Sequence, residues 1–146
     1  MQNITKIVVP VDLQQHTEKL TEFAINIAGK LDAEVSFIHV VKPLDSYSGV
    51  VHPSWDQIEK ELKEHAQEKI DNLVTDNKAQ CAGCSGKVSY GDAVDQILAY
   101  VEAEKASMII IGTHGRKGLE KIMLGSVASE IAKQAPCPTL LFNPYK

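Results

Sequence analysis

The chain alternates short β-branched apolar runs with longer stretches in which apolar residues recur at helical spacing. The apolar runs predict strands at residues 6–11, 34–41, 87–90, 108–111 and 138–142. The helical stretches lie between them, at 20–31, 58–73, 93–101 and 126–135. Parallel strands need such alternation, because a crossover must return the chain to the same end of the sheet. The pattern predicts one α/β domain over residues 1–146, with helices on both faces of a five-stranded parallel sheet.

The expected strand order places two motifs in one crevice. A Rossmann-like, doubly wound sheet of five strands commonly has the order 3-2-1-4-5, which reverses between the first and fourth strands. Ligands of such sheets bind at this reversal, outside the carboxyl ends of the strands. The first strand ends in Pro10-Val11-Asp12, and the fourth is followed by Gly112-Thr113-His114-Gly115. We therefore expect these two segments to line one ligand site, although Asp12 could also serve only to cap the next helix.

The glycines after the fourth strand suggest what this ligand is. Gly112 and Gly115 are followed by nine residues, then by Gly125-Ser126 and a helical pattern. Glycine lets the backbone approach an anion closely, and the free N–H groups at a helix start point toward it. Simple turn glycines are the alternative interpretation. The strand, glycine-bearing loop and helix start together favour a phosphate-binding site.

Composition excludes several classes of protein. The formal net charge of −4 argues against nucleic acid as the main partner, since binding to its backbone requires a basic surface. No apolar run approaches the roughly 20 residues that span a bilayer. The first residues lack the apolar stretch of a secretion signal. We therefore expect a cytoplasmic protein that binds neither nucleic acid nor membrane.

Motifs spread over nearly the whole chain follow the pattern of one known family. The motifs are Gly112-x-x-Gly115-x(9)-Gly125-Ser126, Pro10-Val11-Asp12, Ile38-His39-Val40, Gly91-Asp92 and Pro136-Cys137-Pro138. On these residues the chain resembles the universal stress protein family, in its ATP-binding subclass. It departs from the family after Asp12, where Leu13-Gln14-Gln15-His16 replaces the usual Ser or Thr and Thr17 is the nearest helix cap.

The resemblance implies that the crevice binds ATP, with Mg²⁺ carried on its phosphates. The nucleotide-binding residues it implies are Pro10, Val11, Asp12, Val40, Ile111, Gly112, His114, Gly115, Arg116, Gly125, Ser126 and Val127. Pro10 and Val11 would line the adenine and ribose side, and Val40 would meet adenine through its backbone. Asp12 would take the ribose hydroxyls or lie near the Mg²⁺.

The remaining residues divide between the base and the phosphates. Ile111 and Gly112 would flank the base and the sugar, and the loop from Gly115 through Arg116 to the helix start would hold the phosphates. His114 would contact either phosphate or solvent. Protein side chains alone do not predict a metal site.

No catalytic residue is predicted. The chain lacks the lysine of a G-x-x-x-x-G-K-[ST] loop, and Asp12 is the one acid expected near the site, so fast phosphoryl transfer is not favoured. A nucleotide-dependent regulatory protein in the stress response, with slow or no ATP hydrolysis, is the favoured interpretation. The alternatives are a nucleotide-independent interaction or chaperone-like module and a weak ATPase or nucleotide-transferring enzyme. The resemblance also implies a homodimer through residues 138–142, with a downstream partner that the sequence does not identify.

Three other features have modest interpretations. Cys81 and Cys84 form a C-x-x-C motif, but a redox pair favours a helix N-terminus and zinc would need two more ligands. We interpret them as part of a small-residue loop. His39 is expected to be a hydrogen-bonded core histidine, and Trp55 to help pack the second helix onto the domain.

Overall fold

A computed structural model of the chain describes residues 3–14, 16–43, 54–113 and 125–145. These residues form a five-stranded sheet with the order β3-β2-β1-β4-β5, in which every pairing is parallel. The strands are β1 (Lys6–Pro10), β2 (Glu34–Val41), β3 (Gly83–Tyr90), β4 (Met108–Gly112) and β5 (Thr139–Phe142). The predicted fold class and strand order are confirmed.

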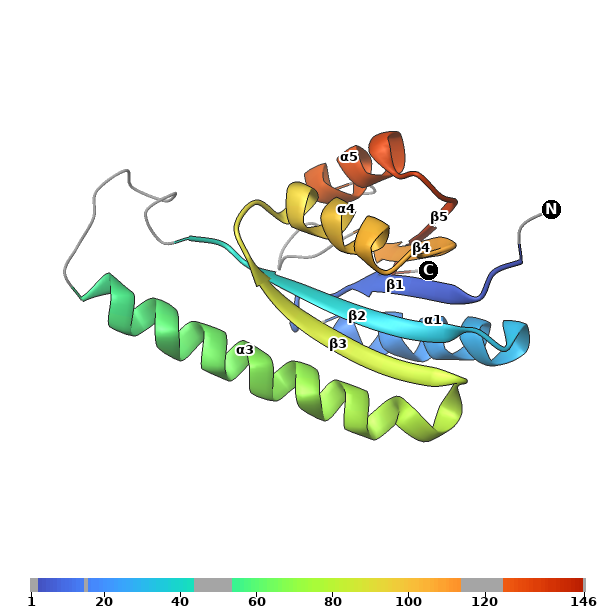
Figure 1. Ribbon diagram of the computed structural model, residues 1–146, viewed down its shortest axis with the longest axis horizontal. Coiled ribbons are helices and arrows are strands. Elements are labelled where there is room, and N and C mark those ends of the chain that lie inside the picture. Colours follow the sequence, from blue (N-terminus) through green and yellow to red (C-terminus); the bar gives the residue numbers. More distant parts are fainter. Residues whose placement is uncertain (1–2, 15, 44–53, 114–124, 146) are drawn as a thin grey trace.

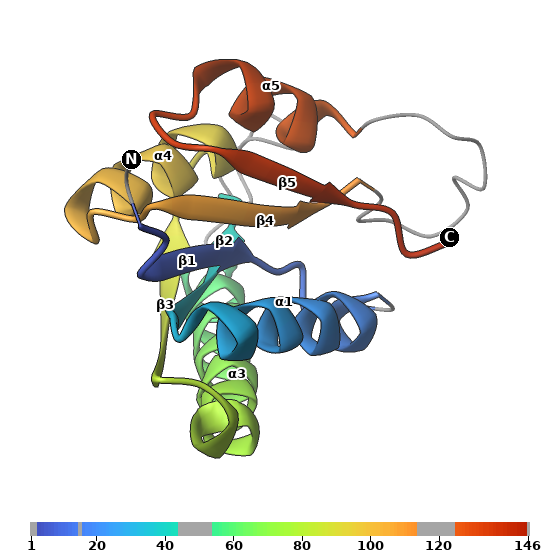
Figure 2. The same ribbon diagram turned by 90° about the vertical axis from the view of Figure 1, so that its right-hand side faces the viewer.

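Helices cover both faces of the sheet (Figure 1). One face carries α1 (Thr17–Leu31) and α3 (Trp55–Asn77), which continues into the short 3₁₀ helix η1 (Lys78–Gln80). The other face carries α4 (Ala93–Ala103) and α5 (Ser126–Gln134), as the turned view in Figure 2 also shows. Within the described residues, no helix combines the length and apolar character needed to cross a membrane.

The central strands contribute to a separate hydrophobic core on each face. Successive side chains of a strand point to opposite faces, so a strand covered on both faces must be apolar throughout. In β1, Ile7 and Val9 pack on the α1/α3 side, whereas Val8 packs on the α4/α5 side. All three are fully buried, which explains the uninterrupted apolar run that predicted this strand.

Strand register aligns the ends of the three central strands. β1 pairs with β2 so that Pro10 lies opposite Ile38, and with β4 so that Val8 lies opposite Ile109. Continuing both registers beyond β1 brings Asp12 level with Val40 and with Thr113. The loop after β1 therefore lies between the ends of β2 and β4, at the reversal of strand order where a ligand is expected.

We expected no helix or strand between residues 73 and 87, and this prediction is wrong for residues 75–86. This stretch contains the last turn of α3, then η1, and then the first half of β3. Residues 83–86 are small and carry little strand propensity, but Gly83 pairs with Glu34 and Gly86 with Phe37 of β2. Pairing with the neighbouring strand β2 overrides local preference here.

Gly86 lies where α3 packs closest to β3. A Cβ at this position would lie 2.5 Å from Cγ2 of Ile70 and 3.0 Å from Cγ2 of Val74. Ile70 is fully buried and cannot move aside. We therefore expect Gly86→Ala to lower the free energy of unfolding by about 1–3 kcal/mol, as overpacking does in other cores, measured by urea denaturation.

Gly29 in α1 provides a matched control. A Cβ there would approach nothing nearer than the Gln80 carbonyl oxygen, at 3.6 Å, an ordinary contact. Gly29→Ala should raise stability by about 0.5–1 kcal/mol through helix propensity. Equal effects of the two substitutions would contradict the packing argument.

Candidate functional site

Asp12 is held rigidly just beyond the end of β1. Its Oδ1 accepts hydrogen bonds from the Gln14 backbone N–H at 2.9 Å and from the Thr17 hydroxyl at 3.0 Å. Its Oδ2 is buried and has no hydrogen-bond partner among the described residues. Leaving a carboxylate oxygen unpaired in a buried place is costly, and such groups are usually satisfied. The arrangement indicates that a donor from outside these residues belongs at Oδ2.

The loop after Asp12 has an unusual backbone conformation that the sequence did not reveal. Leu13 has a φ of 61°, in the left-handed region that residues with a side chain seldom adopt. His16, not Thr17, is the N-cap residue of α1, and it makes no side-chain capping bond. The predicted cap is therefore wrong: the Thr17 hydroxyl instead helps to fix Asp12. Strained backbone is typical of ligand-binding loops, where surrounding contacts hold it in place.

His39 ties the end of β2 to the end of β1. Its Nδ1 lies 2.8 Å from the carbonyl oxygen of Val11, and the Val11 N–H in turn donates to the Ile38 carbonyl at 2.9 Å. Because a carbonyl oxygen only accepts, Nδ1 carries the hydrogen. The predicted hydrogen bond of His39 is confirmed, but the side chain is half-buried and not part of the core. The contact also shows that the backbone at Val11 is fixed on both sides.

The start of α5 is anchored to the end of β4. The Gly125 N–H donates to the Thr113 carbonyl at 3.0 Å, and the Thr113 N–H donates to the Phe142 carbonyl at 2.9 Å. Gly125 is the N-cap residue of α5 and has no side chain to satisfy the first N–H groups of the helix. These groups and the positive end of the helix dipole favour an anion at the carboxyl edge of the sheet.

The structure explains Gly112 and Gly125 differently. A Cβ at Gly125 would lie 3.1 Å from the Thr113 oxygen, so the contact between α5 and β4 itself disfavours a side chain. A Cβ at Gly112 would make only ordinary contacts, 3.8 Å from Leu20 Cδ2 and 3.9 Å from the Phe142 oxygen, and Gly112 has no positive φ. Close approach of a ligand is a physical reason for glycine at 112 that folding does not supply.

The structure gathers the described members of the predicted site at one edge of the sheet. They are Pro10, Val11, Asp12, Val40, Ile111, Gly112, Gly125, Ser126 and Val127. Val11 packs into the core on the α1/α3 side, whereas Val40, Ile111 and Val127 pack on the α4/α5 side. Predicted residues His114, Gly115 and Arg116 lie outside the described residues.

The C-terminal residues contact His16, at the end of the loop between β1 and α1. This contact was not predicted from the sequence. Tyr145 Oη lies 3.1 Å from His16 Nε2, and the two rings meet edge to face at 5.0 Å. Lys19 Nζ donates to the Pro144 carbonyl at 3.4 Å, and Phe23 stacks on Phe142. These contacts join residues more than a hundred positions apart, so no local pattern could have revealed them.

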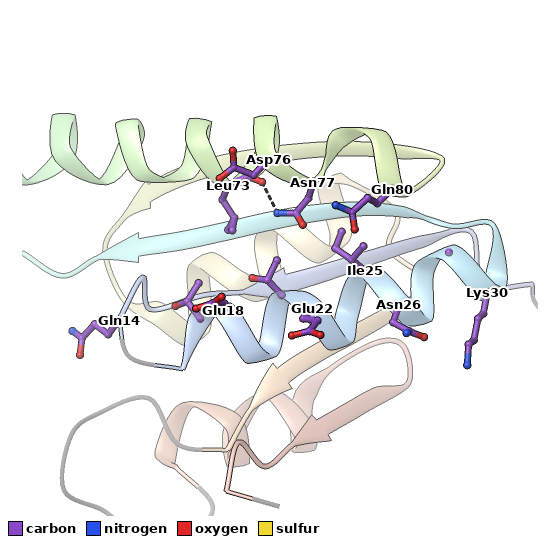
Figure 3. A pocket seen from close by; sticks show the side chains of 13 residues that line it. Gln14, Glu18, Glu22, Ile25, Asn26, Lys30, Leu73, Asp76, Asn77 and Gln80 are labelled. Atoms are coloured by element: carbon purple, nitrogen blue, oxygen red, sulfur yellow. Dashed lines mark hydrogen bonds between the residues drawn. The ribbon is translucent and has the colours of Figure 1, made fainter.

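A groove of about 990 Å³ lies elsewhere, between α1 and α3 (Figure 3). Glu18 and Glu22 from α1 and Asp76 from α3 line it, and all three are exposed. These three carboxylates outnumber Lys30, the one lysine in the groove lining, and disfavour phosphates here. None of the predicted nucleotide-binding residues lines the groove. The groove is therefore not the predicted site. In the part of the chain that the structure describes, no three His, Cys, Asp or Glu side chains cluster to hold a metal ion.

Comparison with known proteins identifies the family. The model of the universal stress protein family matches residues 3–143. Universal stress protein MJ0531 of Methanocaldococcus jannaschii is 35% identical over 141 residues, which cover 97% of this chain and 83% of that protein.

Solved structures share the fold. The universal stress protein UspA of Lactobacillus plantarum superposes with a TM-score of 0.81 at 23% identity, over 97% of this chain and 99% of that one. The universal stress protein of Archaeoglobus fulgidus in complex with dAMP gives a TM-score of 0.65 at 23% identity, over 96% of this chain and 98% of that one. The family match over nearly its full length shows that this chain belongs to the universal stress protein family.

Proposed function

We propose that this protein binds ATP, with Mg²⁺, at the carboxyl edge of β1 and β4 and acts as a nucleotide-dependent regulator. The observation that carries the proposal is the buried, unpartnered Oδ2 of Asp12. It lies at the same edge of the sheet as the uncapped start of α5. The complex of the A. fulgidus relative with dAMP supports an adenine nucleotide as the class of ligand.

Each end of the site suits a different part of the nucleotide. A ribose hydroxyl would donate to Asp12 Oδ2 and so satisfy the buried oxygen. Adenine would lie against Pro10, Val11 and Ile111 and meet the backbone at Val40. Because Val11 is fixed on both sides by His39 and Ile38, this backbone surface is preorganised for a planar base.

Backbone donors would hold the phosphates. Gly112 leaves room for close approach, and the first N–H groups of α5, at Ser126 and Val127, favour negative charge. His114, Gly115 and Arg116 would complete the loop. When bound, Mg²⁺ would neutralise charge on the phosphate oxygens, and Asp12 is the nearest carboxylate of the predicted site.

We propose a binding protein with slow or no hydrolysis rather than a fast enzyme. No carboxylate other than Asp12 belongs to the proposed site, and Oδ1 of Asp12 already accepts two hydrogen bonds. The chain also lacks the phosphate-binding lysine of P-loop enzymes. Occupancy of the site, transmitted through a homodimer, would then be the regulatory signal in a cytoplasmic stress response.

The homodimer would form through residues 138–142. β5 is the last strand in the sheet order and pairs with β4 on its inner side. Leu141 is 40% exposed there, and an apolar strand edge tends to be covered by another chain. Sedimentation at micromolar protein concentration tests this assignment. We expect a dimer, and a monomer would contradict it.

Calorimetric titration of ATP in the presence of Mg²⁺ tests the nucleotide proposal. We expect wild-type protein to bind with micromolar affinity and Gly115→Val to bind at least about tenfold more weakly, since a branched side chain would exclude the phosphates. Gly118→Val is the matched control, because Gly118 lies in the same segment but outside the spacing motif. Circular dichroism checks that each variant folds.

The outcomes separate the function classes. Binding that is lost only in Gly115→Val supports the proposed site. Absence of binding to every form of the protein would contradict it and favour a nucleotide-independent interaction module. Sustained ATP turnover with a defined acceptor would instead favour an enzyme.

A further inference from the structure

Cys81 and Cys84 lie together where the chain passes from α3 into the sheet. Cys81 follows η1 directly, and Cys84 is the second residue of β3, opposite Val35 of β2. The interpretation of both as part of a loop is therefore wrong for Cys84. Both side chains are half-buried against the core of the α1/α3 side, and both are free thiols.

Two backbone carbonyl groups hold the Cys81 thiol at the bend between η1 and β3. Cys81 Sγ lies 3.2 Å from the carbonyl oxygen of Gly83, the residue just before Cys84, and 3.8 Å from the carbonyl of Asn77 in the last turn of α3. A thiol placed on a fully extended strand would point away from a residue three positions on. Here the chain bends at Cys81, so both sulfurs face the same core.

We propose that Cys81 and Cys84 form an oxidation site at which hydrogen peroxide produces a reversible intramolecular disulfide. The bend at Cys81 and the packing of both half-buried thiols against the same core support the proposal. A disulfide requires the two Cβ atoms to come within about 4.5 Å, which a bend between residues three positions apart permits. The proposed disulfide involves none of the residues of the nucleotide site.

The reaction balances with one peroxide. The Cys81 sulfur attacks a peroxide oxygen, the S–O bond forms as the O–O bond breaks, and the departing hydroxide takes up the proton of the Cys81 thiol as water. The Cys84 sulfur then attacks the Cys81 sulfenic acid. The S–S bond forms, the S–O bond breaks, and hydroxide leaves with the Cys84 proton as a second water. Two thiols are oxidised, and one peroxide is reduced to two waters.

The surroundings of the two thiols give them different roles. Burial, followed by the charge of Cys81 and a hydrogen bond with it, raises the pKa of Cys84 to about 12. Cys84 therefore keeps its proton and is the poorer nucleophile of the two. Since thiols react through their ionised form, Cys84 is disfavoured as the first to react, so Cys81 takes the peroxide oxygen and Cys84 resolves the sulfenic acid.

Cys137 is a natural control for this pair. Burial raises the pKa of its thiol, and its side chain packs against the core on the opposite, α4/α5 face of the sheet. It therefore cannot bridge to either partner within one chain without unfolding the sheet. An exposed, unspecific thiol reaction would affect all three cysteines, whereas the proposed reaction affects two.

Mass spectrometry of the peroxide-treated, folded protein tests the proposal. Cleavage after lysine places Cys81 and Cys84 in one peptide, 79–87, and Cys137 in another, 134–146. We expect wild type and Cys137→Ser both to lose the two thiols of peptide 79–87, with that peptide lighter by two hydrogen atoms. Thioredoxin-type dithiol reductant should restore the mass. In Cys84→Ser, a sulfenic-acid probe should label Cys81 after peroxide treatment. In Cys81→Ser, the same probe should not label Cys84.

Clear results would overturn the proposal. One is that peptide 79–87 of wild type keeps both thiols while peptide 134–146 reacts. Another is that the lost thiols are recovered only in intermolecular, reducible dimers on a denaturing gel. The measurement on peptide 79–87 of wild type needs no substitution. It therefore still tests the proposal if one of the variants fails to fold.

Discussion

Replacing Phe37 by alanine is expected to lower the free energy of unfolding by about 3–5 kcal/mol, the usual cost of deleting a buried aromatic side chain. Phe37 is the largest of the fully buried side chains and lies in β2, beneath both α1 and α3. Neither helix can close the cavity without leaving its other contacts. Since domains of this kind are stable by only about 5–15 kcal/mol, the variant should be close to the limit of folding.

Urea denaturation followed by far-ultraviolet circular dichroism measures this effect. Protein concentration should be held constant, because a dimer would make the transition depend on it. Ile58→Ala is the control: Ile58 lies in α3 but is 42% exposed, so we expect a change of less than about 0.5 kcal/mol. Similar losses in both variants would show that burial in this core does not determine stability.

Asp12→Asn should separate nucleotide binding from folding. Asparagine keeps an oxygen that accepts from the Gln14 N–H and the Thr17 hydroxyl, but it replaces the unpartnered Oδ2 by an amide and removes the charge. A charge-assisted hydrogen bond contributes about 1.5–3 kcal/mol, so ATP binding should weaken by about 10- to 100-fold. Without nucleotide, stability should change by less than about 1 kcal/mol, because the loop retains its bonds.

Calorimetry with ATP and denaturation without it measure the two effects on the same samples. Asp92→Asn is the matched control, since Asp92 caps α4 by accepting from the Asp95 N–H at 3.0 Å and its replacement also preserves an oxygen. Its ATP affinity should equal that of wild type. If Asp12→Asn also binds as wild type does, Oδ2 has no role in ligand binding and the proposed ribose contact is wrong.

The position of the candidate site at the carboxyl edge of the sheet could be predicted from the local apolar pattern of the strands and from a general rule of sheet topology. Strand β1 is apolar throughout, so its end at Pro10 and the following Asp12 could be identified from local pattern alone. A general rule of sheet topology then placed Asp12 beside the end of β4. The parallel order confirms this placement.

Other features of the site and its surroundings depend on contacts between distant residues. The first residues of β3, from Gly83 to Gly86, are strand because β2 offers a partner, not because of their own preference. The left-handed Leu13 and the contact of Tyr145 with His16 likewise have no local signature.

The residue pattern predicted the class of fold, the strand order and the edge of the sheet that holds the candidate site. It could do so because the apolar periodicity recurs in every strand and helix, so that many residues support the same prediction. Tertiary structure decided which oxygen of Asp12 lacks a partner, where β3 begins and that both thiols of the cysteine pair pack against one core. The start of β3 depends on pairing with β2, a segment far away in the chain, and the other two features depend on the position of individual side-chain atoms. No average over local sequence records either kind of contact.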